Sequence, residues 1–180
     1  KSTFRSQMVD FNRNFLDPDT PLTCIGKGEI GGKAEGLAAI SSVLHEHIQA
    51  NPVPDIEVEI PPMAVLCTDV FDAFMEQNQL YDLALADLPD ERIAHAFQKA
   101  DLPFEALGDL RSIIENIHTP LAIRSSSLLE DTKNEPFAGI YHTKMIPNNE
   151  YDPDIRFRQL VEAVKFVYAS TYFRGAKGYR

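Results

Sequence analysis

Glycine and lysine residues gather in one short segment, residues 26–33, which reads Gly-Lys-Gly-Glu-Ile-Gly-Gly-Lys. A glycine turn that leads into a helix presents backbone amides at the positive end of the helix dipole, and such a place attracts phosphate groups. Lys33, the last residue of the segment, would add a positive charge for the same anion. The segment therefore predicts an anion site, although a flexible loop with a surface lysine fits its composition equally well.

Two known phosphate-binding patterns can be compared with this segment. The glycine spacing G-x-G-x-x-G of residues 26–31 matches the dinucleotide fingerprint, which also needs a preceding strand and an acidic residue about 20 positions further on. The match is weak, because residues 22–25 make a short strand candidate. A Walker loop is excluded, because lysine stands at position 27 in place of its first glycine and Ala34 replaces the hydroxyl residue after Lys33.

A second group of phosphate-binding side chains follows the apolar residues 121–123. Arg124 ends that apolar run, and three hydroxyl residues come directly after it: Ser125, Ser126 and Ser127. A guanidinium group binds phosphate oxygens in a bidentate manner, and the end of a strand holds it on a rigid support. An ion pair between Arg124 and the nearby Glu130 or Asp131 is the structural alternative.

A third segment of interest runs from Phe137 to Thr143 and contains Ala138, Gly139 and His142. A glycine between extended residues lets a backbone approach a ligand closely, and it can equally mark a β-bulge. Neither the arginine segment nor this one is persuasive alone.

Several helices and a few short strands must position these segments. Apolar residues recur every three or four positions from residue 31 to about 51, which predicts a helix directly after the glycine segment. We expect the remaining elements as follows: a buried strand at 63–67, a helix capped by Thr68, short helices from 81 to 118 broken at Pro89 and Pro103, strands at 121–124 and 137–146, and a helix from Asp152 and Pro153 onward. The pattern predicts an α+β fold in which helices pack on a small mixed or antiparallel sheet, with residues 1–24 as a lead-in.

The composition of the chain indicates which classes of binding partner it can have. The formal net charge of −10 argues against a nucleic-acid partner, but a local basic pocket and Mg²⁺ suffice for a small anionic ligand. No apolar stretch is long enough for a membrane helix. Cys24 and Cys67 do not have the spacing of metal ligands, and we expect no metal ligands in this chain. The low number of cysteines indicates a reducing cytoplasm, and a disulfide between the two is the less favoured alternative.

Taken together, the three segments resemble a known family. Residues 31–37, 123–131 and 136–143, followed by 167–173, resemble in order and register the N-terminal ATP-binding domain of phosphoenolpyruvate synthase and pyruvate phosphate dikinase. The resemblance covers residues 25–180 and implies the first lobe of an ATP-grasp domain, with the second lobe missing. Because the chain does not begin with Met, we also expect it to be a piece of a longer protein.

The resemblance implies a role for several residues. Lys33 and Arg124 would contact the phosphates of ATP, Gly139 would lie in the loop that folds over them, and Thr143 would end that loop near the nucleotide. The supporting residues would be Gly31, Gly32, Ser125, Ser126, Ala138 and His142. His142 departs from the pattern, because relatives usually have aspartate there.

The family also implies a reaction. With ATP and Mg²⁺, the β-phosphoryl group passes to a histidine on a mobile domain and then to pyruvate, which gives phosphoenolpyruvate, AMP and phosphate. None of the histidines of this chain has the carrier context, so we expect no catalytic residue within it and an inactive isolated chain. Two alternatives stay open: the same ATP domain with a glucan or an antibiotic as acceptor, and a nucleotide-binding regulatory module without chemistry.

Overall fold

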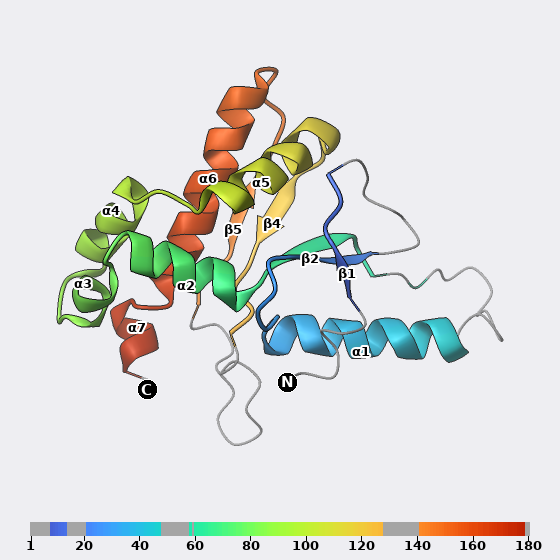
Figure 1. The fold of residues 1–180 in the computed structure, drawn as a ribbon, viewed down its shortest axis with the longest axis horizontal. Helices are drawn as coiled ribbons and strands as arrows, with labels where there is room; N and C mark the ends of the chain where they lie inside the picture. The colour runs from blue at the N-terminus through green and yellow to red at the C-terminus, as the bar shows by residue number, and fades with distance from the viewer. Residues whose placement is uncertain (1–7, 14–20, 48–57, 59, 128–140, 179–180) are drawn as a thin grey trace.

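The computed structural model describes residues 8–13, 21–47, 58, 60–127 and 141–178. Helices surround two small sheets, which confirms the predicted α+β class (Figure 1). In chain order the elements are β1 (Val9–Asp10), β2 (Leu22–Ile25), α1 (Gly32–His47), β3 (Met63–Leu66), α2 (Thr68–Gln77), α3 (Tyr81–Leu85), α4 (Asp90–Lys99), α5 (Phe104–Asn116), β4 (Leu121–Ile123), β5 (Lys144–Ile146), α6 (Pro153–Ser170) and α7 (Arg174–Lys177).

Local signals place most helix boundaries where the sequence predicts them. Pro89 and Pro103 are the N-cap residues of α4 and α5, so each proline stands where a missing backbone N–H costs nothing. At the start of α6, the side chain of Asp152 accepts a hydrogen bond from the backbone N–H of Asp154 at 2.8 Å, with Pro153 beside it in the first turn. No helix of the described ranges has the length and apolar character needed to cross a membrane.

The strands form two small sheets, one parallel and one antiparallel. β2 lies between β1 and β3 and runs parallel to both, and α1 is the crossover between β2 and β3. β4 and β5 form an antiparallel pair apart from them. The parallel arrangement follows from the chain order, because a strand, a helix and a second strand return in the same direction.

The central strand β2 is buried along its whole length, which explains why all its residues except Thr23 are apolar. Leu22 and Cys24 pack with residues of α1, whereas Ile25 belongs to the cluster formed by the other helices. Consecutive strand residues point to opposite faces, so both faces of this short strand need apolar side chains. The last residues of the expected lead-in therefore form the central strand of the sheet.

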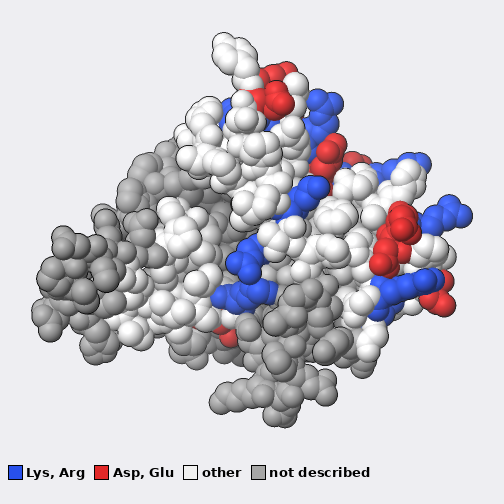
Figure 2. All heavy atoms as spheres, turned by 180° about the vertical axis from the view of Figure 1, so that it is seen from behind, with Lys and Arg blue, Asp and Glu red and all other residues white. Residues whose placement is uncertain are grey.

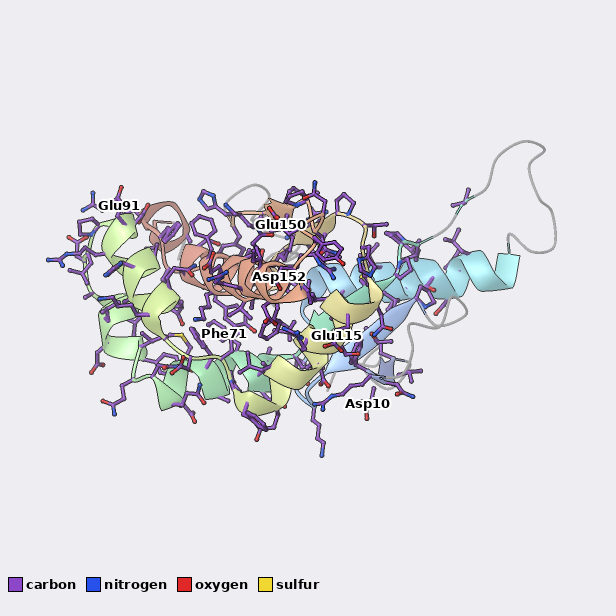
Figure 3. All side chains as sticks on the ribbon, turned by 90° about the horizontal axis from the view of Figure 1, so that it is seen from above. Asp10, Phe71, Glu91, Glu115, Glu150 and Asp152 are labelled. Carbon is purple, nitrogen blue, oxygen red and sulfur yellow. The ribbon has the colours of Figure 1, made fainter. Side chains whose placement is uncertain are left out.

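The larger core gathers around α6. Its apolar face packs against α4 and α5, and aromatic rings join it to α2. The ring centroids of Phe71 and Tyr168 lie 4.9 Å apart in an edge-to-face arrangement, and Figure 3 shows Phe71 between α2 and α6. These contacts fix α6 and, through it, the β4–β5 pair that packs on the same helix.

Candidate functional site

The start of α1 is bound to the residues that follow β4, so the first two predicted segments meet. The backbone N–H of Ala34 donates to the hydroxyl oxygen of Ser126 at 3.0 Å, and the N–H of Gly32 donates to the carbonyl of Ser127 at 3.2 Å. The Ser126 hydroxyl therefore caps a first-turn amide of α1, as an N-cap side chain would, although it lies 92 positions away in the sequence.

Gly31 makes this close approach possible. Its φ is +77°, a backbone conformation that favours glycine, and a Cβ atom at this position would overlap the backbone carbonyl of Ser126. The glycine segment and the arginine segment are thus in direct backbone contact. Lys33 follows Gly31 by two residues and Arg124 precedes Ser126 by two, so the two predicted phosphate ligands belong to this junction.

The antiparallel ladder places Thr143, the last residue of the third segment, beside Arg124. Ile123 is paired with Lys144, so Arg124 and Thr143 stand opposite each other one step beyond the ladder. Both side chains are exposed, as are those of Ala122 and Met145, which share their face of the pair. The backbone contacts therefore link the segments that carry Lys33, Arg124 and Thr143, while Ala138 and Gly139 lie outside the described residues.

Several amides of the glycine segment already have acceptors within the protein. The N–H groups of Lys27 and Gly28 donate to the carboxylate of Asp69 at 2.8 and 2.9 Å, and that of Glu29 donates to the hydroxyl of Thr68 at 3.0 Å. The amides of Gly32 and Ala34 are also hydrogen-bonded, so an anion at this site would be bound mainly by charged side chains. This differs from the expected helix N-terminus with open amides.

The anchoring residues Thr68 and Asp69 were missed by the sequence reasoning. We expected Thr68 to cap α2, but Cys67 is the N-cap residue and makes no side-chain cap bond. Thr68 is the first residue of the helix, and its hydroxyl accepts from Glu29 instead. A Thr-Asp pair at a helix start indicates a local cap, and nothing local reveals an acceptor role 39 to 42 residues away.

His142 has an exposed side chain beside aromatic rings. Its ring lies edge-to-face to Phe166 and Phe173, with centroid distances of 5.7 and 5.5 Å, and its backbone N–H donates to the hydroxyl of Ser170 at 3.2 Å. The ammonium group of Lys144 lies 5.5 Å from the centroid of the Phe166 ring. These contacts hold the start of β5 on the C-terminal half of α6.

Positive charge gathers on one face of an otherwise acidic molecule. Figure 2 shows lysine and arginine side chains in a line across the middle of that face, with acidic side chains toward its edges. Arg124 and Lys144 are exposed, and Lys33 is half-buried. The formal net charge of the whole chain is −10, so a local basic surface is what an anionic ligand requires.

Among the described residues, the side chains that could bind a metal do not cluster. No group of three His, Cys, Asp or Glu side chains there is arranged to hold one. Both cysteines are buried, and no disulfide joins them.

The dinucleotide alternative meets one of its requirements and fails another. The unit β2–α1–β3 is parallel, as that reading demands. However, Ser126 and Ser127 occupy the first-turn amides of α1 on which a pyrophosphate would have to lie, and the strands around Arg124 are antiparallel. The glycines thus allow a contact within the protein, which is not the role that the dinucleotide fingerprint gives them.

Comparison with known proteins agrees with the three segments. The family model described as pyruvate phosphate dikinase, AMP/ATP-binding domain, matches residues 27–180. No curated protein and no solved structure matches the chain. The match spans all three segments and most of the chain, so this protein belongs to the family of pyruvate phosphate dikinase AMP/ATP-binding domains.

Proposed function

We propose that the chain is the front lobe of an ATP-grasp domain that binds the phosphates of ATP in a dikinase-type phosphotransferase. The observation that carries the proposal is the junction of α1 with the β4–β5 pair, where three segments far apart in the sequence meet. Membership in an AMP/ATP-binding family supplies the ligand class. Lys33 and Arg124 supply the positive charge, and Thr143 supplies a hydroxyl beside Arg124.

Each of these groups suits phosphoryl transfer. The arginine offers a planar pair of N–H donors for two oxygens of one phosphate, and the lysine offers a compact charge for a neighbouring phosphate. Catalysis of phosphoryl transfer depends on positioning and on neutralisation of the developing charge, so side chains fixed on a helix start and a strand end are well placed for it. Gly139 and Ala138 would close over the phosphates, with Gly31, Gly32, Ser125 and Ser126 in support.

The remaining steps belong to other parts of the full-length protein. We propose that the β-phosphoryl group passes to a carrier histidine and then to pyruvate, with AMP and phosphate as the other products. ATP would arrive with Mg²⁺, for which this chain supplies no described ligand set. The isolated chain would bind nucleotide weakly and would not catalyse the transfer. The compartment would be the cytoplasm.

The experiment uses the full-length protein with Mg²⁺ and ATP labelled on the β-phosphate, with and without pyruvate. We expect label on a histidine, release of AMP, and discharge of the label when pyruvate is added. Arg124→Ala should abolish the label, while Arg92→Ala, which removes an exposed arginine from α4, should retain it. Label that pyruvate does not discharge would indicate another acceptor, such as a glucan or an antibiotic.

A negative result has a defined meaning. If ATP binds but no label transfers and no AMP forms, the enzyme assignment is wrong. The chain would then be part of a nucleotide-binding module without phosphoryl transfer.

A further inference from the structure

The glycine segment is clamped to the start of α2 by Asp69 and Thr68. We propose that Asp69 is a positioning residue for ATP binding, which acts by holding the glycine segment so that Lys33 faces the phosphates. This inference rests on the proposed function of Lys33, and it assigns a role to a residue outside the three family segments.

The clamp consists of four hydrogen bonds between two short stretches of backbone. The two carboxylate oxygens of Asp69 accept one bond each from consecutive amides, those of Lys27 and Gly28. The hydroxyl of Thr68 accepts from the N–H of Glu29, and the N–H of Thr68 donates to the carbonyl of Glu29 at 2.9 Å. Hydrogen bonds to an ionised carboxylate are stronger than neutral ones, so Asp69 is the principal member.

The sequence of the loop is adapted to this contact. A Cβ atom at Gly28 would overlap the Thr68 hydroxyl and would lie 2.6 Å from the backbone nitrogen of Asp69. The two backbones therefore approach each other more closely than any side chain at position 28 would allow. Close approach of this kind is what glycine provides.

The clamp can influence Lys33 because the chain between them is short and held at both ends. Ile30 is 1% exposed and packs in the smaller core with α1, and Gly31 lies against Ser126. Asp69 holds the front of the segment and Ser126 holds its end, so Lys33 leaves a backbone fixed on both sides. Loss of the front contact would let the helix start shift, and a small misplacement of a ligand-binding group weakens binding strongly.

A purely structural role for Asp69 predicts a different result from a positioning role. Loss of stability alone would lower ATP affinity by the same factor whether or not Lys33 is present. Positioning through Lys33 predicts that the effect disappears once Lys33 is removed, because residues in one network are not additive. A double-mutant cycle therefore separates the two.

The experiment measures the dissociation constant of ATP by calorimetry for the full-length protein and for Asp69→Ala, Lys33→Ala and the double variant. We expect Asp69→Ala to weaken ATP binding about tenfold in the wild-type background and less than about twofold in the Lys33→Ala background. Asp72→Ala is the matched control, since Asp72 is exposed on the same helix and its carboxylate accepts from the hydroxyl of Tyr81 at 3.3 Å, away from the glycine segment. It should stay within about twofold of wild type.

Two further variants keep the test decisive if Asp69→Ala is poorly folded. Asp69→Asn retains one acceptor oxygen and should show a smaller loss, and Gly28→Ala should reproduce the loss while Asp69 is intact. Thermal unfolding of each variant is measured in parallel. Equal losses in both backgrounds, or no loss in Asp69→Ala where Lys33→Ala weakens binding, would overturn the inference. If Lys33→Ala itself leaves ATP affinity unchanged, the proposed function of Lys33 is wrong and the inference falls with it.

Discussion

Tyr168 carries a buried hydroxyl for which the described residues offer no hydrogen-bond partner. Its ring packs against Phe71 and Phe74, with centroid distances of 4.9 and 5.5 Å, so the ring stabilises the core while the hydroxyl costs free energy. We predict that Tyr168→Phe raises the free energy of unfolding by about 1 kcal/mol, because it removes an unsatisfied polar group without altering the ring. Tyr151→Phe, at a fully exposed tyrosine, is the control and should change nothing measurable.

Tyr168 should also make the stability of the fold depend on pH in the alkaline range. Burial raises the pKa of Tyr168, with smaller contributions from Cys67 and Asp69. A pKa that is higher in the folded state gives stability that is complete below about pH 10, the ordinary tyrosine range, and that is lost as the pH rises above it. Chemical denaturation between neutral and alkaline pH should therefore show a smaller alkaline loss in Tyr168→Phe than in wild type. A lower stability of Tyr168→Phe at neutral pH would mean that the hydroxyl does have a partner.

At the scale of elements, the cap that Ser126 places on α1 joins the two halves of the candidate site. We predict that Ser126→Ala lowers the free energy of unfolding by about 1 kcal/mol, the usual cost of losing an N-cap side chain, and also weakens ATP binding. Ser42→Ala is the comparison, because the Ser42 hydroxyl only donates to the carbonyl of Ala38 within α1. Thermal unfolding and calorimetry measure the two effects, and equal results for both serines would contradict the capping role.

The elements also show which parts of the fold the sequence could predict. The start of α6 was predictable because Asp152 and Pro153 act within one helical turn. Arg156 shows the opposite case: it is 3% exposed, and its guanidinium donates to the carbonyls of Ile114 and Ile117 at 2.8 and 3.2 Å. A charged residue in a helix normally predicts an exposed position, and only the end of another helix makes this burial possible.

The candidate site divides in the same way. Residue type and the family pattern were enough to propose Lys33, Arg124 and Thr143, because charged and hydroxyl side chains beside glycine or at a strand end suit phosphate binding. Their meeting place depends on contacts that span 92 residues for Ser126 and 41 for Asp69. Such contacts leave no periodic or local signal, so the clamp on the glycine segment became visible only in the structure.

The whole molecule combines a net charge of −10 with a line of basic side chains on one face (Figure 2), and α1 meets the residues after β4 at one junction. The parallel sheet with α1 forms one side of that junction, and the β4–β5 pair on α6 forms the other (Figure 1). If Lys33 on one side and Arg124 on the other both contact ATP, tight binding requires both sides. The central claim is therefore that Lys33 and Arg124 bind the same ATP.

The measurement that tests this claim most directly is the affinity of the full-length protein for ATP, compared with Lys33→Ala and Arg124→Ala. We predict that each variant binds at least about tenfold more weakly, as expected for loss of a charged contact to phosphate. Lys99→Ala and Arg92→Ala, two exposed cations on α4 far from α1 in Figure 1, should bind as wild type does. Unchanged affinity in both Lys33→Ala and Arg124→Ala, or a wild-type protein that does not bind ATP, would contradict the account.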